Sequence, residues 1–253
     1  MKKILIIGII FILIGGVFCG VAYAAGEKYM DLKLTNFSTN FSAESVSRIN
    51  IGKHIGDIKI VSGENSGELM VRAENVAESG FVCDLSGGCL NISYDPHTIK
   101  IGFISVPSFV FEPFWNTKNP VITVYVPDGA SLDEVYFDGG VGNTEIDNVK
   151  ANSFVINGGV GNYSAKNIYA KNIKIEGGVG DAKIQGKIEG DIKINGGVGN
   201  VALDLSGDSN DYSVKSDGGV GSVRINGKPA KNTGGGKYRI DIDGGVGNID
   251  INF

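Results

Sequence analysis

The stretch Gly139-Gly140-Val141-Gly142-Asn143 decides the fold, because the chain repeats it at nearly regular intervals. Most copies follow one another at the same spacing, and only the last two spacings are longer. Self-similarity at a near-fixed period of this size is typical of a solenoid, in which each repeat forms one coil. The six copies, each Gly-Gly-Val-Gly followed by Asn, Asp or Ser, are Gly139–Asn143, Gly158–Asn162, Gly177–Asp181, Gly196–Asn200, Gly218–Ser222 and Gly244–Asn248.

Apolar residues alternate with polar ones on both sides of each pentapeptide. In the fourth copy, Ile192 and Ile194 precede the glycines, and Val201 and Leu203 follow them. A period of two on both sides of a glycine corner predicts two short strands, each with one face buried. A third short side of the coil is predicted from one further apolar position, which holds Val149, Ile168 and Ile188.

A coil of this length cannot bury its own apolar face, so successive coils must stack and pair in parallel. Stacking places each valine above the last and each Asn, Asp or Ser above its equivalent, which predicts a ladder of polar side chains at the corner. Residues 55–60 match the pattern of residues 179–184 and form a degenerate copy. The sequence therefore predicts an all-β, single-domain parallel β-helix (β-solenoid) of about 19-residue coils over residues 49–253.

Within that solenoid, residues 49–130 are expected to form irregular coils and residues 131–253 regular ones. Residues 26–48 are expected to hold a spacer and the first strand. Extra residues near 206–211 and 228–236 account for the two longer spacings, and insertions in a solenoid go to loops on one face. These loops are candidates for function.

Residues 1–25 have the composition of a targeting segment. Lys2 and Lys3 form a positive n-region, and no charge follows between Ile4 and Ala25. The segment Ala22-Tyr23-Ala24 fits a signal-peptidase site, whereas the uncharged run is also long enough to span a bilayer. We expect a signal anchor, a transmembrane helix, with a cleaved signal peptide as the alternative. Both place the rest of the chain outside the cell membrane, at the cell surface.

Cys83 and Cys89 are the only cysteines that follow this segment. In an oxidising compartment an isolated pair separated by the short stretch Asp84–Gly88 predicts a disulfide that closes a small loop. A metal site is the alternative, but two ligands do not make a site, and His54 and His97 do not stand at ligand spacing from the cysteines. Free thiols are the remaining alternative.

An aromatic segment interrupts the pattern between residues 102 and 120, and it contains three prolines. Such a segment is a candidate partner-binding surface. The alternative, which we favour, is that the loop covers an open end of the solenoid as a cap. The partner-binding candidates are Phe109, Phe111, Phe114 and Trp115.

Several chemistries do not fit the sequence. Repeated Gly-Gly-x-Gly loops that bind calcium need an acidic residue at the sixth position, and here that position holds Thr144, Tyr163 or an aliphatic residue. The glycines do not open a helix, as a nucleotide-binding loop would require. Outward acidic residues are interspersed with lysines, and no nucleophile motif stands near a histidine. We therefore expect no catalytic, cofactor or metal site, and the net charge of −5 without a basic patch argues against a nucleic-acid partner.

Residues 121–146 run from a strand through Val126-Pro127-Asp128-Gly129 and a second strand into the first pentapeptide. This order resembles the putative-adhesin family of β-strand-repeat domains of unknown function, and the resemblance covers most of residues 49–253. It implies a parallel β-helix on the outside of a bacterial cell envelope. It brings no catalytic or ligand residues.

We therefore expect a non-enzymatic, adhesin-like binding or structural module on a bacterial cell surface, with a cell-surface glycan or protein as partner. An alternative is an envelope-stress accessory protein that binds a membrane or protein partner through the aromatic segment. A carbohydrate-active β-helix enzyme is less favoured. Because Asn252-Phe253 ends the chain directly after a strand, we also expect end-to-end self-association.

Overall fold

The structure is a computed structural model that describes Gly15 and residues 34–63, 67–95, 98–101, 104–107, 118–229 and 233–253. Contacts divide the chain into two units, Met1–Lys33 and Leu34–Phe253. The predicted targeting segment lies outside the described residues except for Gly15. Among the described residues no helix is both long and apolar enough to cross a membrane.

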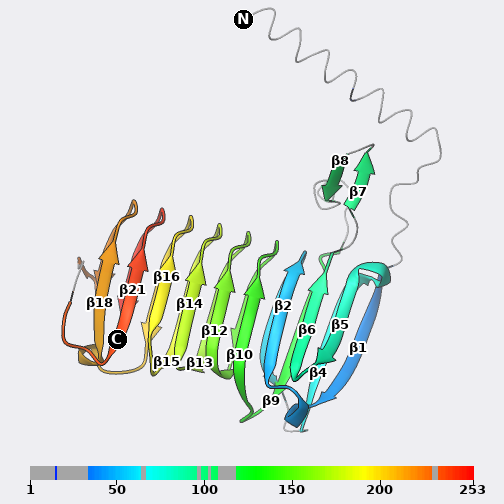
Figure 1. Ribbon diagram of the computed structural model, residues 1–253, viewed down its shortest axis with the longest axis horizontal. Helices are drawn as coiled ribbons and strands as arrows, with labels where there is room; N and C mark the ends of the chain where they lie inside the picture. Colours follow the sequence, from blue (N-terminus) through cyan, green and yellow to red (C-terminus); the bar gives the residue numbers. More distant parts are fainter. Residues whose placement is uncertain are drawn as a thin grey trace, which may run out of the picture. The chain divides into compact units, whose positions relative to one another are not determined.

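The second unit is built from strands, and one continuous sheet contains 20 of them (Figure 1). It bends into two ladders of mostly parallel strands that face each other. The predicted all-β class is confirmed. In the first ladder the strands lie in the order β5 (Phe81–Ser86), β6 (Cys89–Tyr94), β2 (Arg48–His54), β10 (Ser131–Asp138), β12 (Lys150–Asn157), β14 (Asn172–Glu176), β16 (Ile192–Asn195), β21 (Tyr238–Asp243) and β18 (Tyr212–Asp217).

The second ladder runs beside the first and is joined to it by the glycine corners. Short 3₁₀ helices at Ala43–Ser45, Glu78–Gly80 and Ser209–Asp211 and a separate hairpin of β7 (Thr98–Ile101) and β8 (Ile104–Pro107) complete the fold. The strand order in this ladder is β1 (Leu34–Ser42), β4 (Glu68–Ala77), β9 (Val121–Pro127), β3 (Asp57–Gly63), β11 (Thr144–Asp147), β13 (Tyr163–Ala170), β15 (Ala182–Ile188), β17 (Val201–Leu205), β22 (Ile249–Asn252), β19 (Val223–Ile225) and β20 (Lys228–Pro229).

The core lies between the two ladders and follows the alternation seen in the sequence. Ile192 and Ile194 of β16 and Leu203 of β17 are buried, and Lys193 between the two isoleucines is exposed. Burial of each such side chain contributes roughly 1.5–3 kcal/mol. Val149, Ile168 and Ile188, from which a third side was predicted, are buried, but Ile168 and Ile188 lie near the ends of β13 and β15 in the second ladder and do not form a separate strand.

The corners pair residue by residue. Val141, Val160, Val179 and Val198 form a chain of parallel bridges, one valine from each coil, and Ile55 of the degenerate copy pairs with Val141. Residues 55–60 therefore belong to a coil, as their similarity to the repeat predicts. Each corner needs glycine because its backbone has positive φ, for example 139° at Gly180.

At both ends of the solenoid the order of the coils in space departs from their order in the sequence (Figure 1). The last coil, β21 and β22, does not lie at the end. It is inserted between the coil of β16 and β17 and the coil of β18 and β19. At the other end β2 lies between β6 and β10, and β3 lies between β9 and β11.

The outer coil at the C-terminal end is partly covered by the chain itself. β20 pairs antiparallel with β19. The backbone N–H of Thr233 donates to the carbonyl of Val214 in β18 at 2.8 Å, and the Val214 N–H donates to Oγ1 of Thr233 at 2.9 Å. The insertion predicted near residues 228–236 thus contributes to the edge of the outer strands. The strand that ends at Asn252 is therefore not the outer strand of this end, and end-to-end association stays a prediction.

Candidate functional site

The corner between the two ladders forms one continuous edge, here called the glycine edge, which consists of Lys53–Asp57 and the six Gly-Gly-Val-Gly pentapeptides. Its valines do not enter the core. Four of them are 52–53% exposed, Val220 is 71% exposed, and the sixth, Val141, is partly buried. Because neighbouring parallel strands lie about 4.8 Å apart, these side chains form a single apolar row. The half-exposed members of the row are Val160, Val179, Val198 and Val246.

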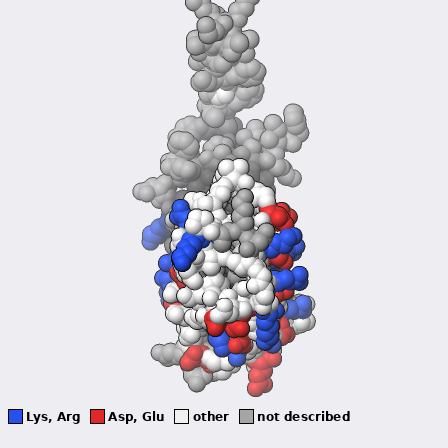
Figure 2. Space-filling model, turned by 90° about the vertical axis from the view of Figure 1, so that its left-hand side faces the viewer, with Lys and Arg blue, Asp and Glu red and all other residues white. Residues whose placement is uncertain are grey.

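Most charged side chains lie on the faces of the two ladders, and the edge itself contains only Lys53, Asp57 and Asp181. Figure 2, which looks at the end formed by β18, shows Lys, Arg, Asp and Glu along the two flanks and the lower part, while the upper and middle part of the described surface is uncharged. The salt bridges follow the same distribution, because pairs such as Lys174–Glu176 and Lys187–Glu189 lie on strands of the two ladders. The glycine edge is thus an apolar strip beside charged faces.

A ladder of polar side chains runs beside the valine row. The side-chain oxygen of each corner residue accepts a hydrogen bond from the backbone N–H of the equivalent residue in the next coil. Asn143 N–H donates to Asp57 at 2.9 Å, and Asn200 N–H donates to Asp181 at 2.8 Å. The predicted ladder is therefore present. It continues through Asn162, Asn248 and Ser222.

The aromatic segment leaves the solenoid at this same edge. In the outermost coil at the N-terminal end, the corner between β6 and β9 is replaced by the chain from Asp95 to Asn119. Two anchors, Tyr94 and Pro120, hold the ends of this chain against the neighbouring coil. Ile55 N–H donates to Tyr94 O at 3.1 Å, and Asp57 N–H donates to Pro120 O at 2.9 Å. β8 lies in the aromatic segment and pairs with β7, which directly precedes the segment. The predicted partner-binding residues Phe109, Phe111, Phe114 and Trp115 lie outside the described residues.

A cavity of about 510 Å³ opens beside these anchors, at the ends of β6, β2, β10 and β12. His54 lines it and is 3% exposed, which makes it the most buried ionisable side chain at the edge. Its Nδ1 lies 3.1 Å from the carbonyl oxygen of Gly52. Burial lowers the pKa of His54, against the opposing effects of that hydrogen bond and of the charge of Asp57, so the neutral ring is favoured.

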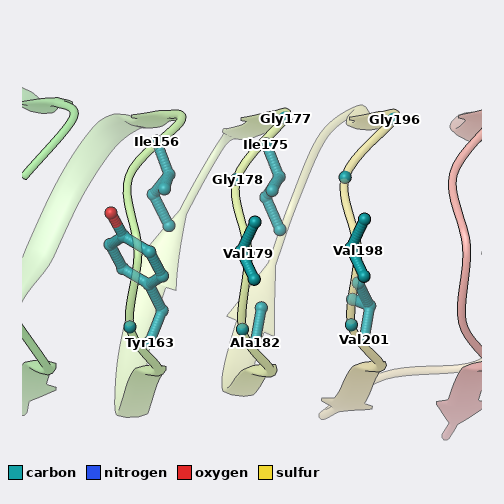
Figure 3. Close-up of a pocket in the computed structure, with 14 residues that line it drawn as sticks. Ile156, Tyr163, Ile175, Gly177, Gly178, Val179, Ala182, Gly196, Val198 and Val201 are labelled. Carbon is teal, nitrogen blue, oxygen red and sulfur yellow. The ribbon is translucent and has the colours of Figure 1, made fainter. Parts of the chain in front are cut away.

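A second, much smaller cavity of about 30 Å³ lies inside the solenoid under the corners (Figure 3). In one coil the ring of Tyr163 rises toward the glycines, and its hydroxyl donates to Gly158 O at 3.1 Å. Ala182 and Val201 occupy the same position in the next two coils and are too short to reach the corner (Figure 3). The interior near Val179 and Val198 therefore has room for little more than one water molecule.

A family model matches most of the described strands of the solenoid. Residues 46–233 match the family model described as Toastrack DUF4097. The chain belongs to the Toastrack family. The match confirms the resemblance to a family of unknown function, and it includes the anchors of the aromatic segment and five of the six pentapeptides.

Solved structures with low sequence identity resemble this Toastrack chain. A cell adhesion protein named as putative from Clostridium sporogenes has a TM-score of 0.48 and 17% identity, with 87% of this chain and 99% of that chain covered. A putative adhesin from Bacteroides fragilis has a TM-score of 0.40 and 15% identity, with coverage of 87% and 97%. A putative lipid binding protein from Parabacteroides distasonis has a TM-score of 0.41 and 15% identity, with coverage of 86% and 94%. A search of curated proteins found no match.

The two cysteines of this Toastrack chain do not form the disulfide that their spacing predicts. Both are free, and they belong to the hairpin of β5 and β6. Its register places Cys83 opposite Ile92, and Ile92 is three residues from Cys89 on the same strand, so the two cysteines point to opposite faces. A bond between them would need a shift of that register. Cys83 shares its face with buried residues, and burial with the charge of Asp84 raises its pKa to about 11.

The described part of the chain does not form a metal centre. No group of three or more His, Cys, Asp or Glu side chains there is placed to hold a metal ion. The sixth positions of the pentapeptide motif, Thr144, Tyr163 and Ala182 among them, point into the core rather than toward the valine row. What the glycine edge offers is an apolar strip, an ordered polar ladder and, among its cavities, one that is lined by a buried histidine.

Proposed function

We propose that this Toastrack chain is a non-enzymatic, adhesin-like binding module of the bacterial cell surface and that the glycine edge is its contact surface. The observation that carries the proposal is the continuous row of exposed valines along the glycine edge. An apolar strip of this kind, bordered by polar groups, is typical of an interaction site. The edge also carries the aromatic segment, because both anchors of that segment lie on it.

The strip is rigid, which suits a contact surface. Every valine belongs to a backbone bridge with the coil above or below, and the adjacent side-chain ladder ties the same corners together. A preorganised surface loses little conformational entropy on binding, so more of its apolar burial contributes to affinity. The uncharged N-terminal run supports a position outside the membrane, where such a surface meets other envelope components.

The experiment compares binding of the full chain to bacterial cell envelopes with binding of a variant that carries Val160→Thr, Val179→Thr and Val198→Thr. These changes keep side-chain shape and net charge but make the row polar. The control carries Val82→Thr and Val155→Thr, which make the same change on strand faces away from the edge. Thermal denaturation of all three proteins verifies folding.

We expect at least tenfold weaker envelope binding for the row variant and unchanged binding for the control. Equal binding by the row variant and the parent would overturn the glycine edge as the contact surface. Turnover of an envelope polysaccharide by the purified chain would overturn the non-enzymatic assignment.

A further inference from the structure

We propose that the cavity beside His54 binds a polyhydroxylated ligand of one or two sugar rings, with His54 Nε2 as acceptor for a ligand hydroxyl. The inference rests on the proposed function, since it names the chemistry that one end of the glycine edge recognises. The polar side chains of the cavity are not part of the valine row, and the only pentapeptide valine among the residues that line it is Val141, so the cavity and the row can be tested separately.

The cavity exists because one corner departs from the repeat. Where each regular copy has two glycines before the valine, the degenerate copy has Lys53 and His54 before Ile55. The imidazole lies against Gly140 of the next coil, where a Cβ atom would be only 2.3 Å from its Cε1. The glycine of one coil thus makes room for the histidine of another. If filling that space were the only role of the residue, an apolar side chain would serve, because a buried ring nitrogen without a partner is costly.

The hydrogen bond of Nδ1 determines the tautomer of the His54 ring and therefore makes Nε2 a hydrogen-bond acceptor. The carbonyl of Gly52 can only accept, so Nδ1 carries the proton and the neutral ring has its lone pair on Nε2. Within the described part of the chain Nε2 has no hydrogen-bond partner. His54 is nevertheless almost fully buried and lines the cavity. Nε2 is therefore an acceptor of fixed orientation that is available to a ligand.

The other polar groups of the cavity also have capacity for a ligand. Lys53, Asp95 and Asp138 are exposed, and none of them makes an ion pair with the described residues. Asn157 donates from Nδ2 to the hydroxyl of Tyr136 at 2.7 Å, while its Oδ1 is buried without a partner. Two carboxylates and an imidazole lone pair are acceptors, and they match a ligand rich in hydroxyl donors.

Charge, shape and size narrow the ligand class further. The two carboxylates outnumber the one ammonium group, which disfavours an anion such as phosphate. The described residues lack the three-ligand cluster that a metal ion would need. Ile55 and Val141 add apolar surface to the wall, and about 510 Å³ falls within the range of small-ligand sites. A short saccharide, with hydroxyls at its edge and C–H groups on its face, fits both kinds of surface.

The test uses the full chain and four defined probes, maltose, cellobiose, lactose and N,N′-diacetylchitobiose, with binding measured by calorimetry and by the NMR signals of the His54 ring. We expect saturable binding of at least one probe and a shift of the Nε2 resonance. Asp138→Asn and Asp95→Asn should weaken that binding at least fivefold, and His54→Phe at least tenfold. Asp250→Asn, on β22 of the second ladder, is the matched control and should bind as the parent does.

The two aspartate variants alter exposed side chains, so they test the site even if His54→Phe does not fold. Failure of all four saccharides to bind, or equal weakening by Asp250→Asn, would overturn the inference. So would tighter binding of inorganic phosphate or Ca²⁺ with the same dependence on Asp138. If the valine-row variant loses envelope binding while no saccharide binds, the proposed function stands and this inference falls. If a saccharide binds the cavity and the row variant still binds envelopes, the inference stands and the contact surface falls.

Discussion

The carbonyl oxygen of Gly161 occupies the space in which a side chain on Gly180 would begin, since a Cβ atom on Gly180 would lie 2.1 Å from it. The same relationship joins Gly199 to Gly180 and Gly161 to Gly142. The fourth residue of each pentapeptide is therefore glycine because of the coil next to it. The first residue is glycine for another reason, as Gly177 has open space around its Cα but a φ of 64°.

This difference predicts unequal costs for two similar substitutions. Gly180→Ala forces two coils apart and strains the backbone, and we expect a loss of about 3 kcal/mol or more in the free energy of unfolding. Gly177→Ala strains the backbone alone and should cost about 1–2 kcal/mol. Urea denaturation of both variants measures the difference. Equal losses would show that contact between coils does not decide the choice of glycine.

The polar ladder allows a second comparison at one position. Asp181→Ala removes the acceptor for the N–H and Nδ2 of Asn200, which lie at 2.8 and 3.1 Å. We expect a loss of about 1 kcal/mol because the site is exposed and water replaces part of the interaction. Asp181→Asn keeps the acceptor, as other copies do, and should change stability by less than about 0.5 kcal/mol. If Asp181→Ala left the free energy of unfolding unchanged, the ladder would not be stabilising.

Thr144 offers a stabilising substitution. It is 2% exposed, and its Oγ1 is buried without a hydrogen-bond partner. Thr144→Val replaces an unsatisfied hydroxyl by a methyl group of similar size, so we expect a gain of about 1 kcal/mol in unfolding free energy. Thr123→Val on β9 is the control, because that hydroxyl is not among the buried unpaired atoms, and it should change little. A loss of stability in Thr144→Val would indicate a bound water at Oγ1.

The cysteines can be distinguished by their reactivity. Because the pKa of Cys83 is raised to about 11, its thiolate fraction at pH 8 is roughly a hundredfold lower than in the unfolded chain. Iodoacetamide should therefore modify Cys83 much more slowly in the folded protein than in urea, as followed by mass spectrometry without reductant. Both cysteines should be modified in urea. Recovery of an unmodified Cys83–Cys89 peptide under those conditions would establish a disulfide instead.

His54 predicts a pH dependence of stability. Its pKa is lowered by burial in the folded state, so the unfolded chain takes up the proton first, near the ordinary histidine pKa of 6.5. The contribution of the neutral ring is present above that value and is lost as the pH falls through the folded pKa. Unfolding free energies between pH 7.5 and 5.5 should decline less steeply in His54→Gln than in the parent. Parallel curves for the two proteins would contradict this assignment.

The sequence predicted the parts of the fold that depend on local pattern. The alternation around Ile192 and Leu203 and the glycine corners repeat in every coil, so their period reports the coil directly. The coil order at the ends could not be predicted in this way. β18 and β21 carry equivalent patterns, and either could lie next to β16. The two longer spacings, from Gly196 to Gly218 and from Gly218 to Gly244, were a signal, because they provide the extra chain that the inserted coil requires.

The candidate site was predicted only in part. The sequence indicated that the valines stack, but the alternation continues through the corner without showing which side of it faces solvent. Val179 and Ile175 look equally apolar in sequence, and only Ile175 is buried. The role of His54 was missed because its position is defined by Gly140, which lies far away in the sequence. Alignment of Lys53-His54 with the two glycines of the repeat was the available signal.

The inserted position of the last coil determines how this protein would respond to a pulling force at its C-terminus. Such a load enters at β21 and β22, and each of these strands is hydrogen-bonded to neighbours on both edges. A coil at the end of the stack would lose its backbone hydrogen bonds one at a time. Here the hydrogen bonds on both edges of β21 and β22 must break together. The fold therefore places β22, the strand nearest to Phe253, where mechanical resistance is high.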